Sequence, residues 1–104
     1  IQSLNLTNTT HPKQFELYQN YPNPFNPVTT FKYDLAHRTR VTFTIYNIIG
    51  KRVLSFDRGE EAAGNKSFLW DGTNDHGKAV SAGIYLFQIK TENFIQTRKM
   101  ILLK

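Results

Sequence analysis

The sequence contains no cysteine, and it has only one methionine and one tryptophan among its 104 residues. Without cysteine the chain can form no disulfide, no thiolate metal site and no cysteine nucleophile. This absence does not decide the compartment, because a β-sandwich of this length can be stable without disulfides. No stretch approaches the roughly 18 to 20 apolar residues of a transmembrane segment, and no signal peptide is visible. Because the sequence begins at Ile1 rather than Met, we expect a domain taken from a larger protein.

The formal net charge of +5 comes from 13 basic and 8 acidic residues. The basic residues are dispersed and form no run, which argues against a nucleic-acid-binding arm. A modest positive charge of this kind favours a solvated surface. An anionic partner such as lipopolysaccharide or an acidic glycan is the alternative.

Patterns of catalysis and metal binding are also lacking. His11, His37 and His76 are isolated in the sequence, and none has a partner at the spacing of zinc ligands. There is no nucleophile elbow, phosphate-binding loop or dinucleotide-binding glycine pattern. We therefore expect neither an enzymatic activity nor a cofactor.

Alternation of apolar and polar residues predicts an all-β fold, a β-sandwich of seven antiparallel strands. A loop is expected at Asp57–Asn65, with Gly59 and Gly64 at its ends. Residues 1–14 are predicted to be a linker, with a possible short strand at 4–7 and glycosylation sequons at Asn5 and Asn8. The expected strands cover residues 15–19, 29–35, 41–46, 52–56, 66–70, 83–91 and 94–103.

The segment Asn20–Pro27 contains Pro22, Pro24 and Pro27, which flank Phe25. Proline cannot donate to a β-ladder and forces extended geometry on the preceding residue. The segment is therefore predicted to run along the edge of a sheet. A ligand for a groove-binding domain is the alternative.

The central stretch Trp70–Tyr85 is predicted to be a strand end, a polar loop and the start of the next strand. Trp70 is the expected core anchor. The oxygen-rich sequence Asp71–Gly77 resembles a calcium loop, but the ligand spacing and closing glutamate of an EF-hand are missing. Turn capping by the short polar side chains explains the composition more simply, and calcium stays an open alternative.

Four aromatic residues are not placed in the core by the alternation of their neighbours in the sequence, and such residues could stack on sugars. Packing in the core or at an edge is favoured for them. The four are Tyr18, Tyr21, Phe25 and Phe94.

Three blocks in order resemble one family over residues 15–104: Leu17–Leu35, Val41–Val53 and Gly64–Lys104. They are similar to the C-terminal sorting domains, type A, of proteins exported by the type IX secretion system of Bacteroidota and related Gram-negative bacteria. Trp-Asp-Gly followed by Gly-x-Tyr also resembles the immunoglobulin-like domain of flagellar hook-capping proteins. The Pro-Asn-Pro-Phe-Asn-Pro segment and the Lys-Met-x-Leu-Leu-Lys ending favour the sorting family.

The resemblance implies a seven-stranded immunoglobulin-like sandwich without catalytic activity at the C-terminus of a larger cargo protein. Such a domain directs passage from the periplasm through the outer-membrane translocon to the surface or medium, and a sortase-like peptidase removes it. One departure is Ser81-Ala82, where the family often has a proline. The implied sorting-signal residues are Gly83, Tyr85, Lys99, Met100, Leu102, Leu103 and Lys104, and the implied structural anchors are Pro22, Pro24, Phe25, Pro27, Trp70, Asp71, Gly72 and Gly77.

Two other functions are compatible with the sequence. One is a carbohydrate-binding or structural accessory module of a secreted enzyme. The other is a structural module like that of hook-capping proteins. Neither nucleic acid nor a transmembrane segment is expected in any of these roles.

Overall fold

The structure is a computed structural model that describes residues 12–103. The short strand expected at residues 4–7, the two sequons and Lys104 lie outside the described residues. Seven strands are present in the described part of the chain, as the sequence predicts. They are β2 (Glu16–Leu17), β3 (Thr29–Leu35), β4 (Thr39–Asn47), β5 (Arg52–Glu61), β6 (Gly64–Trp70), β7 (Gly83–Lys90) and β8 (Ile95–Leu102).

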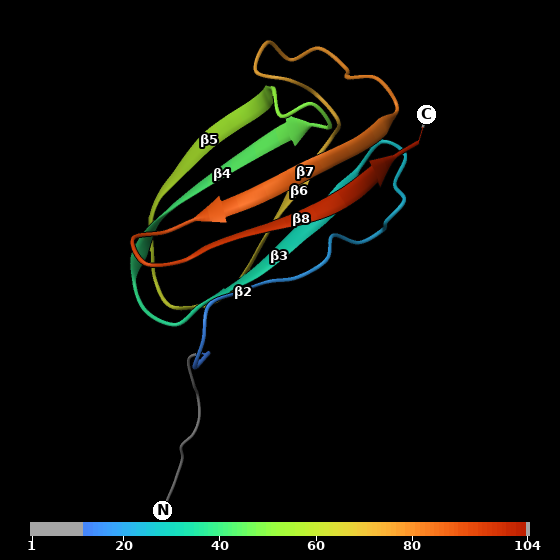
Figure 1. Ribbon diagram of the computed structural model, residues 1–104. Coiled ribbons are helices and arrows are strands. Elements are labelled where there is room, and N and C mark those ends of the chain that lie inside the picture. The colour runs from blue at the N-terminus through green and yellow to red at the C-terminus, as the bar shows by residue number, and fades with distance from the viewer. Residues whose placement is uncertain (1–11, 104) are drawn as a thin grey trace, which may run out of the picture.

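The strands form two antiparallel sheets that pack face to face (Figure 1). One sheet has the order β2-β3-β6, and the other has the order β5-β4-β7-β8. The first described residues and the end of β8 lie at opposite ends of the sandwich (Figure 1). The predicted all-β, immunoglobulin-like sandwich is thus the observed fold.

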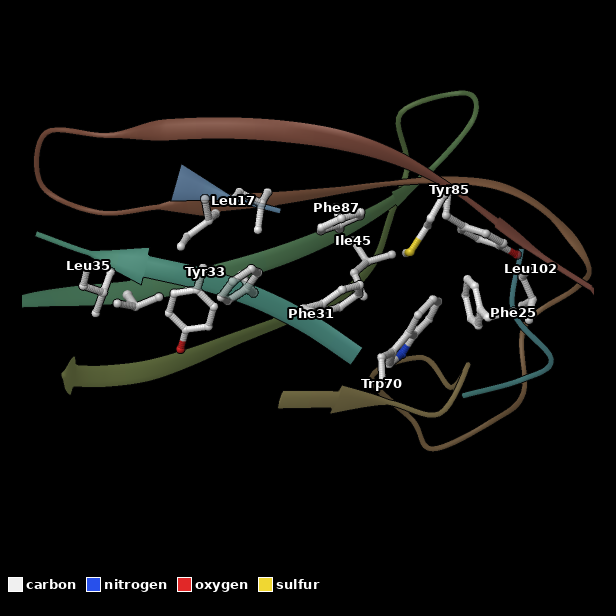
Figure 2. Close-up of a cluster of buried hydrophobic side chains, with 14 residues drawn as sticks. Leu17, Phe25, Phe31, Tyr33, Leu35, Ile45, Trp70, Tyr85, Phe87 and Leu102 are labelled. Atoms are coloured by element: carbon white, nitrogen blue, oxygen red, sulfur yellow. The ribbon is translucent and has the colours of Figure 1, made fainter. Parts of the chain in front are cut away.

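The core lies between the sheets because most of the inward side chains are apolar. In β3, every second residue from Thr29 to Leu35 is buried, and β4 and β7 repeat this alternation. Phe31 stacks on Phe87 with ring centroids 4.4 Å apart, so the two sheets meet at this pair. Figure 2 shows the buried side chains in a row between the sheets, with Trp70 and Phe25 at one end and Leu35 at the other.

The loop expected at Asp57–Asn65 is wrong, because β5 continues to Glu61. Gly59 does not end the strand; it lies in a β-bulge, where the register shifts between Val41 and Thr42 of β4. Its φ of +74° and the hydrogen bond from its N–H to Asp57 Oδ1 (2.8 Å) are typical of a bulge that glycine accommodates. Only two residues then connect β5 to β6.

Other boundaries differ by a few residues from those expected. The first strand is reduced to Glu16–Leu17, because the chain leaves the ladder soon after Tyr18 donates its N–H to Lys32 O (3.0 Å). Strand β4 is longer than expected at both ends, and β6 begins at Gly64. Strand β3 has the predicted bounds.

Candidate recognition surface at the C-terminal strand

The alternation of β8 divides the predicted sorting residues between the core and the surface. Met100 and Leu102 are fully buried, whereas Lys99 and Leu103 are exposed. Ile101 lies between the two buried residues and points outward, with 37% of its surface exposed. A partner that reads the folded domain therefore meets Lys99, Ile101 and Leu103 but not Met100 or Leu102.

Gly83 and Tyr85 are built into the fold rather than displayed. The Tyr85 side chain is buried, and its hydroxyl donates to Ser81 O (2.6 Å). Its ring packs edge-on against Trp70 with centroids 6.0 Å apart, and burial raises the pKa of the Tyr85 hydroxyl. Gly83 has a φ of +151°, which disfavours other residues at the start of β7. The Gly-x-Tyr element therefore closes the central loop onto the core.

The free edge of β8 is covered by the proline segment, Asn20–Pro27. Phe25 N–H donates to Ile101 O (3.0 Å), and the Asn23 side chain accepts from Ile101 N–H (2.9 Å). Just before the segment, the Gln19 amide donates to Lys99 O (2.7 Å). The predicted edge position of the proline segment is confirmed. A partner sheet therefore cannot add a strand at Lys99–Leu103, because this edge is already occupied.

The outer face of β7 and β8 carries apolar residues where solvated positions are expected. Ile84 and Ile101 lie directly opposite each other, and Ile84 is 40% exposed. Leu86 and Lys99 form the next pair along the strands. We call Ile84, Lys99, Ile101 and Leu103 the terminal patch.

The charge of this face is of one sign. Strands β7 and β8 contain no acidic residue, and the basic residues on their outer face are Lys90 and Lys99, whereas Arg98 lies on the inner side and donates to Leu17 O of the other sheet. Arg98 pairs with Glu16 at 3.5 Å, while within residues 12–103 neither Lys90 nor Lys99 forms an ion pair. The arrangement can attract an acidic partner surface that has apolar residues of its own.

The polar residues of the central loop cap turns and tie the loop to β5. The side chain of Asn74 accepts the N–H groups of His76 (2.9 Å) and Lys78 (3.0 Å), and Asp71 accepts the hydroxyl of Thr73 (2.6 Å). Asp75 instead bonds to a residue outside the loop, because its Oδ1 accepts the N–H of Ser55 in β5 at 3.2 Å. Turn capping therefore accounts for the oxygen-rich sequence. Within residues 12–103, no three or more His, Cys, Asp or Glu side chains group as metal ligands.

Three of the predicted structural anchors, Phe25, Pro27 and Gly72, lie close to Trp70. Trp70 is buried, donates its ring N–H to Thr73 O (2.9 Å) and packs on Phe25 with centroids 5.8 Å apart. Gly72 has a φ of +79° and approaches the backbone so closely that a Cβ would lie 3.3 Å from Pro27 O. The chain reversal after β6 and the proline segment are thus packed together.

A cleft of about 550 Å³ opens at this end of the sandwich, between the β4–β5 hairpin and the central loop. It is bordered by polar side chains from both sides, among them Asn47, Lys51 and His76, and Tyr85 lines it as well. Two of its lining residues, Arg52 and Asp75, pair with each other at 3.3 Å. No convergent set of catalytic groups is present in this cleft.

Of the four aromatic candidates, two are packed against other side chains and two are exposed to solvent. Phe25 is only 1% exposed, and Phe94 stacks on Phe15 with centroids 5.5 Å apart, so both pack as favoured. Tyr18 and Tyr21 instead face the solvent, with 44% and 79% of their surfaces exposed.

Sequence reasoning missed the roles of Ile84, Ile101 and Asp75. The first two had a visible signal, because alternation places these isoleucines on the polar side of their strands. Asp75 had none, because its partner Ser55 lies 20 residues away in the sequence.

Comparison with known proteins places this fold in a family. A family model described as the FlgD Ig-like domain matches residues 27–93, more than half of the chain. The chain belongs to the FlgD Ig-like domain family. The match includes β3 to β7 and the central loop, and it stops short of β2 and β8. No curated protein matches the chain.

Solved structures share the fold at low sequence identity. Dimeric latent PorU from Porphyromonas gingivalis has a TM-score of 0.71 and 20% identity over 94% of this chain. FlgD from P. aeruginosa has a TM-score of 0.58 and 27% identity over 71% of this chain. PorZ from Porphyromonas gingivalis, described as an essential surface component of the type IX secretion system, has a TM-score of 0.58 and 15% identity over 85% of this chain. The chain spans only 10% of PorU, 58% of FlgD and 11% of PorZ.

Residues 12–103 contain no helix with the length and apolarity needed to cross a membrane.

Proposed function

We propose that this FlgD Ig-like domain is a type A C-terminal sorting domain of the type IX secretion system. It directs an upstream cargo protein from the periplasm through the outer-membrane translocon and is then removed by a sortase-like peptidase, so that the cargo is secreted or held at the cell surface. The domain acts by being recognised and performs no catalysis. It requires no cofactor, nucleic acid or transmembrane segment, and residues 1–14 serve as its linker.

The observation that carries this proposal is the position of the terminal patch. The patch lies at the end of β8, and the chain enters the sandwich at the opposite end (Figure 1). A folded cargo that precedes residue 12 therefore leaves Lys99, Ile101 and Leu103 accessible to a receptor. The chemistry suits a receptor surface that is acidic around an apolar centre, since basic and apolar side chains are combined here without an acidic neighbour on β7 or β8.

The comparisons support the proposal in two ways. PorZ is described as a surface component of the same secretion system, and its structure includes a similar fold. The two sequence blocks that favour the sorting family over the hook-capping family, the proline segment and the Lys-Met-x-Leu-Leu-Lys ending, lie almost wholly outside residues 27–93. They therefore distinguish this chain from the general family pattern.

The test is a reporter fused to residues 1–104 in a host with a working type IX system. Deleting Lys99–Lys104 would be a poor probe, because it removes Met100 and Leu102 from the core. The double variant Lys99→Glu, Ile101→Ser changes only exposed side chains and is expected to retain the reporter in the periplasm.

The matched control is Lys90→Glu, Ile95→Ser, which alters the cross-strand pair at the other end of the same face. We expect this control to be exported like the unaltered domain and to show a similar melting temperature. Retention of the unaltered fusion in the periplasm would refute the sorting function. Equal export of both double variants would refute the terminal patch as the recognised surface.

A second candidate is a structural module of a filament cap, which the family match and the 27% identity to FlgD favour. It predicts that the purified domain co-sediments with a flagellar hook filament, and that the reporter fusion stays in the periplasm. The sorting domain is expected to do neither.

A further inference from the structure

The outer face of the β2-β3-β6 sheet carries two solvent-exposed tyrosines along one side. Tyr21 pairs with Thr30 of β3, and Leu69 of β6 pairs with the same Thr30 from the other side. Tyr18 is level with Lys32, the next outward residue of β3. We call this surface the tyrosine face. It is separate from the terminal patch, which lies on the other sheet.

Tyr18 is bonded to β3 through both its backbone and its hydroxyl. Its N–H bonds to Lys32 O, while its hydroxyl donates to the carboxylate of Asp34, two residues farther along β3. Two residues of a strand span about 7 Å, which is close to the length of a tyrosine side chain. The Tyr18 side chain is therefore tethered to β3 at both ends, and 44% of its surface stays exposed.

A hollow of about 340 Å³ lies beside this ring. Its walls carry hydrogen-bonding groups of several kinds, and its polar side chains include the carboxylates of Glu16 and Asp34 and the amide of Gln14. Asp34 also accepts the amide of Asn65 at 2.7 Å, which fixes the carboxylate in position. A carboxylate has about four acceptor positions, so Asp34 keeps capacity for further hydroxyl donors.

Tyr21 offers a second ring on a fixed backbone. Its N–H donates to Thr30 O (3.1 Å), and its carbonyl accepts from Thr30 N–H (2.9 Å). The ring itself is 79% exposed. Because the backbone is already fixed, binding orders only the two side-chain torsions of Tyr21.

We propose that the tyrosine face binds a neutral polysaccharide chain, with sugar rings packed on Tyr18 and Tyr21. The apolar C–H faces of a sugar suit the negative face of an aromatic ring, and sugar hydroxyls suit the carboxylate and amide groups of the hollow. Glu16 and Asp34 of the hollow are balanced by Lys13 and by Lys32 on the same face, so the surface offers no excess of positive charge to uronic acid or sulfated chains. This inference does not depend on the sorting function, because it concerns a different sheet.

The test is affinity electrophoresis of the 104-residue chain in gels that contain soluble β-glucan, xylan, mannan or starch, with alginate as the anionic comparison. We expect retardation by at least one neutral polymer and none by alginate. Tyr18→Ala and Tyr21→Ala are each expected to raise the dissociation constant about two- to tenfold, as for the loss of one aromatic packing partner. Tyr18→Phe keeps the ring but loses its tether to Asp34, so we expect a smaller loss.

Tyr46→Ala serves as the control, since Tyr46 lies on the outer face of the other sheet and pairs with Leu86. Thermal melting confirms that each variant is folded. Migration unaffected by every neutral polymer, stronger retardation by alginate, or equal affinity of the Tyr18, Tyr21 and Tyr46 variants would each overturn the proposal. Export of the reporter fusion by these variants reports separately on the sorting function.

Discussion

The carbonyl oxygen of Phe25 accepts the N–H of Leu103 at 2.7 Å, so the proline segment is bonded to the last residue that the structure describes. Together with the bond from Phe25 N–H to Ile101 O, this pairs the segment with β8 in parallel, as an isolated bridge at Leu102. An open edge strand is a template for association with other chains. The bridge closes this edge and leaves the side chains of the terminal patch free.

Replacing Phe25 should cost far more stability than replacing its exposed neighbour Tyr21. Phe25 is buried against Trp70, so Phe25→Ala leaves a cavity and is expected to lower the free energy of unfolding by about 3–5 kcal/mol. Tyr21→Ala should change it by less than about 0.5 kcal/mol. Urea unfolding followed by Trp70 fluorescence measures both. Similar losses in the two variants would mean that Phe25 does not anchor the segment.

Two glycines with similar dihedrals provide a matched pair for the close packing of Gly72. Gly72 and Gly77 have φ values of +79° and +74°, so alanine is strained at both. At Gly77 a Cβ meets open space, whereas at Gly72 it would meet Pro27 O at 3.3 Å. We expect Gly72→Ala to be more destabilising than Gly77→Ala by about 1 kcal/mol or more. Equal melting temperatures would show that the backbone of Pro27 can move away without cost.

The sequence predicts the core well, because burial on one face of a strand imposes a period of two. Phe31, Tyr33 and Leu35 point inward as expected, and so do Tyr85 and Phe87. The single tryptophan is the anchor it was expected to be. These features depend on neighbours within one strand, so local reasoning is sufficient.

The parts that could not be predicted depend on partners far apart in the chain. Nothing local indicates that Gly59 lies in a bulge opposite β4 rather than in a loop. The contacts of Asn23 and Gln19 with β8 join residues about 80 positions apart. The candidate surface could therefore be predicted only in part. Alternation separates the exposed Lys99 from the buried Met100, but the sequence does not show that the proline segment closes the edge of β8.

Stability at alkaline pH should depend on Tyr33. Its hydroxyl donates to Glu61 Oε1 (2.5 Å), and burial, followed by the Glu61 carboxylate, raises the pKa of Tyr33 well above its ordinary value of 10.0. Because the pKa is higher in the folded state, this group favours folding fully below pH 10, and the contribution is lost as the pH rises above 10. The expected slope is about 1.4 kcal/mol per pH unit at most.

Tyr33→Phe provides the comparison for that titration. Tyr18 and Tyr85, whose pKa values are also raised, are present in both proteins, so their effects cancel in the difference. Denaturant unfolding between pH 8 and 11 should show a shallower decline for the variant than for the original chain. Parallel declines would mean that the Tyr33 hydroxyl ionises equally in both states.

Asp75 should protect the edge of β5 in the way that Phe25 protects β8. Asp75 donates its own N–H to Val53 O (3.2 Å), and its carboxylate accepts the N–H of Ser55. Asp75→Ala removes the second of these bonds and is expected to cost about 1 kcal/mol and to speed amide exchange at Ser55. Arg52→Ala removes only the ion pair between Arg52 and Asp75, in which the arginine side chain is 62% exposed. This variant should therefore cost less than about 0.5 kcal/mol and leave amide exchange at Ser55 unchanged. If the two variants exchange alike, the carboxylate acts through Arg52 rather than through the edge of β5. If only Asp75→Ala accelerates exchange, a loop residue replaces a ladder partner on this edge and limits strand addition there.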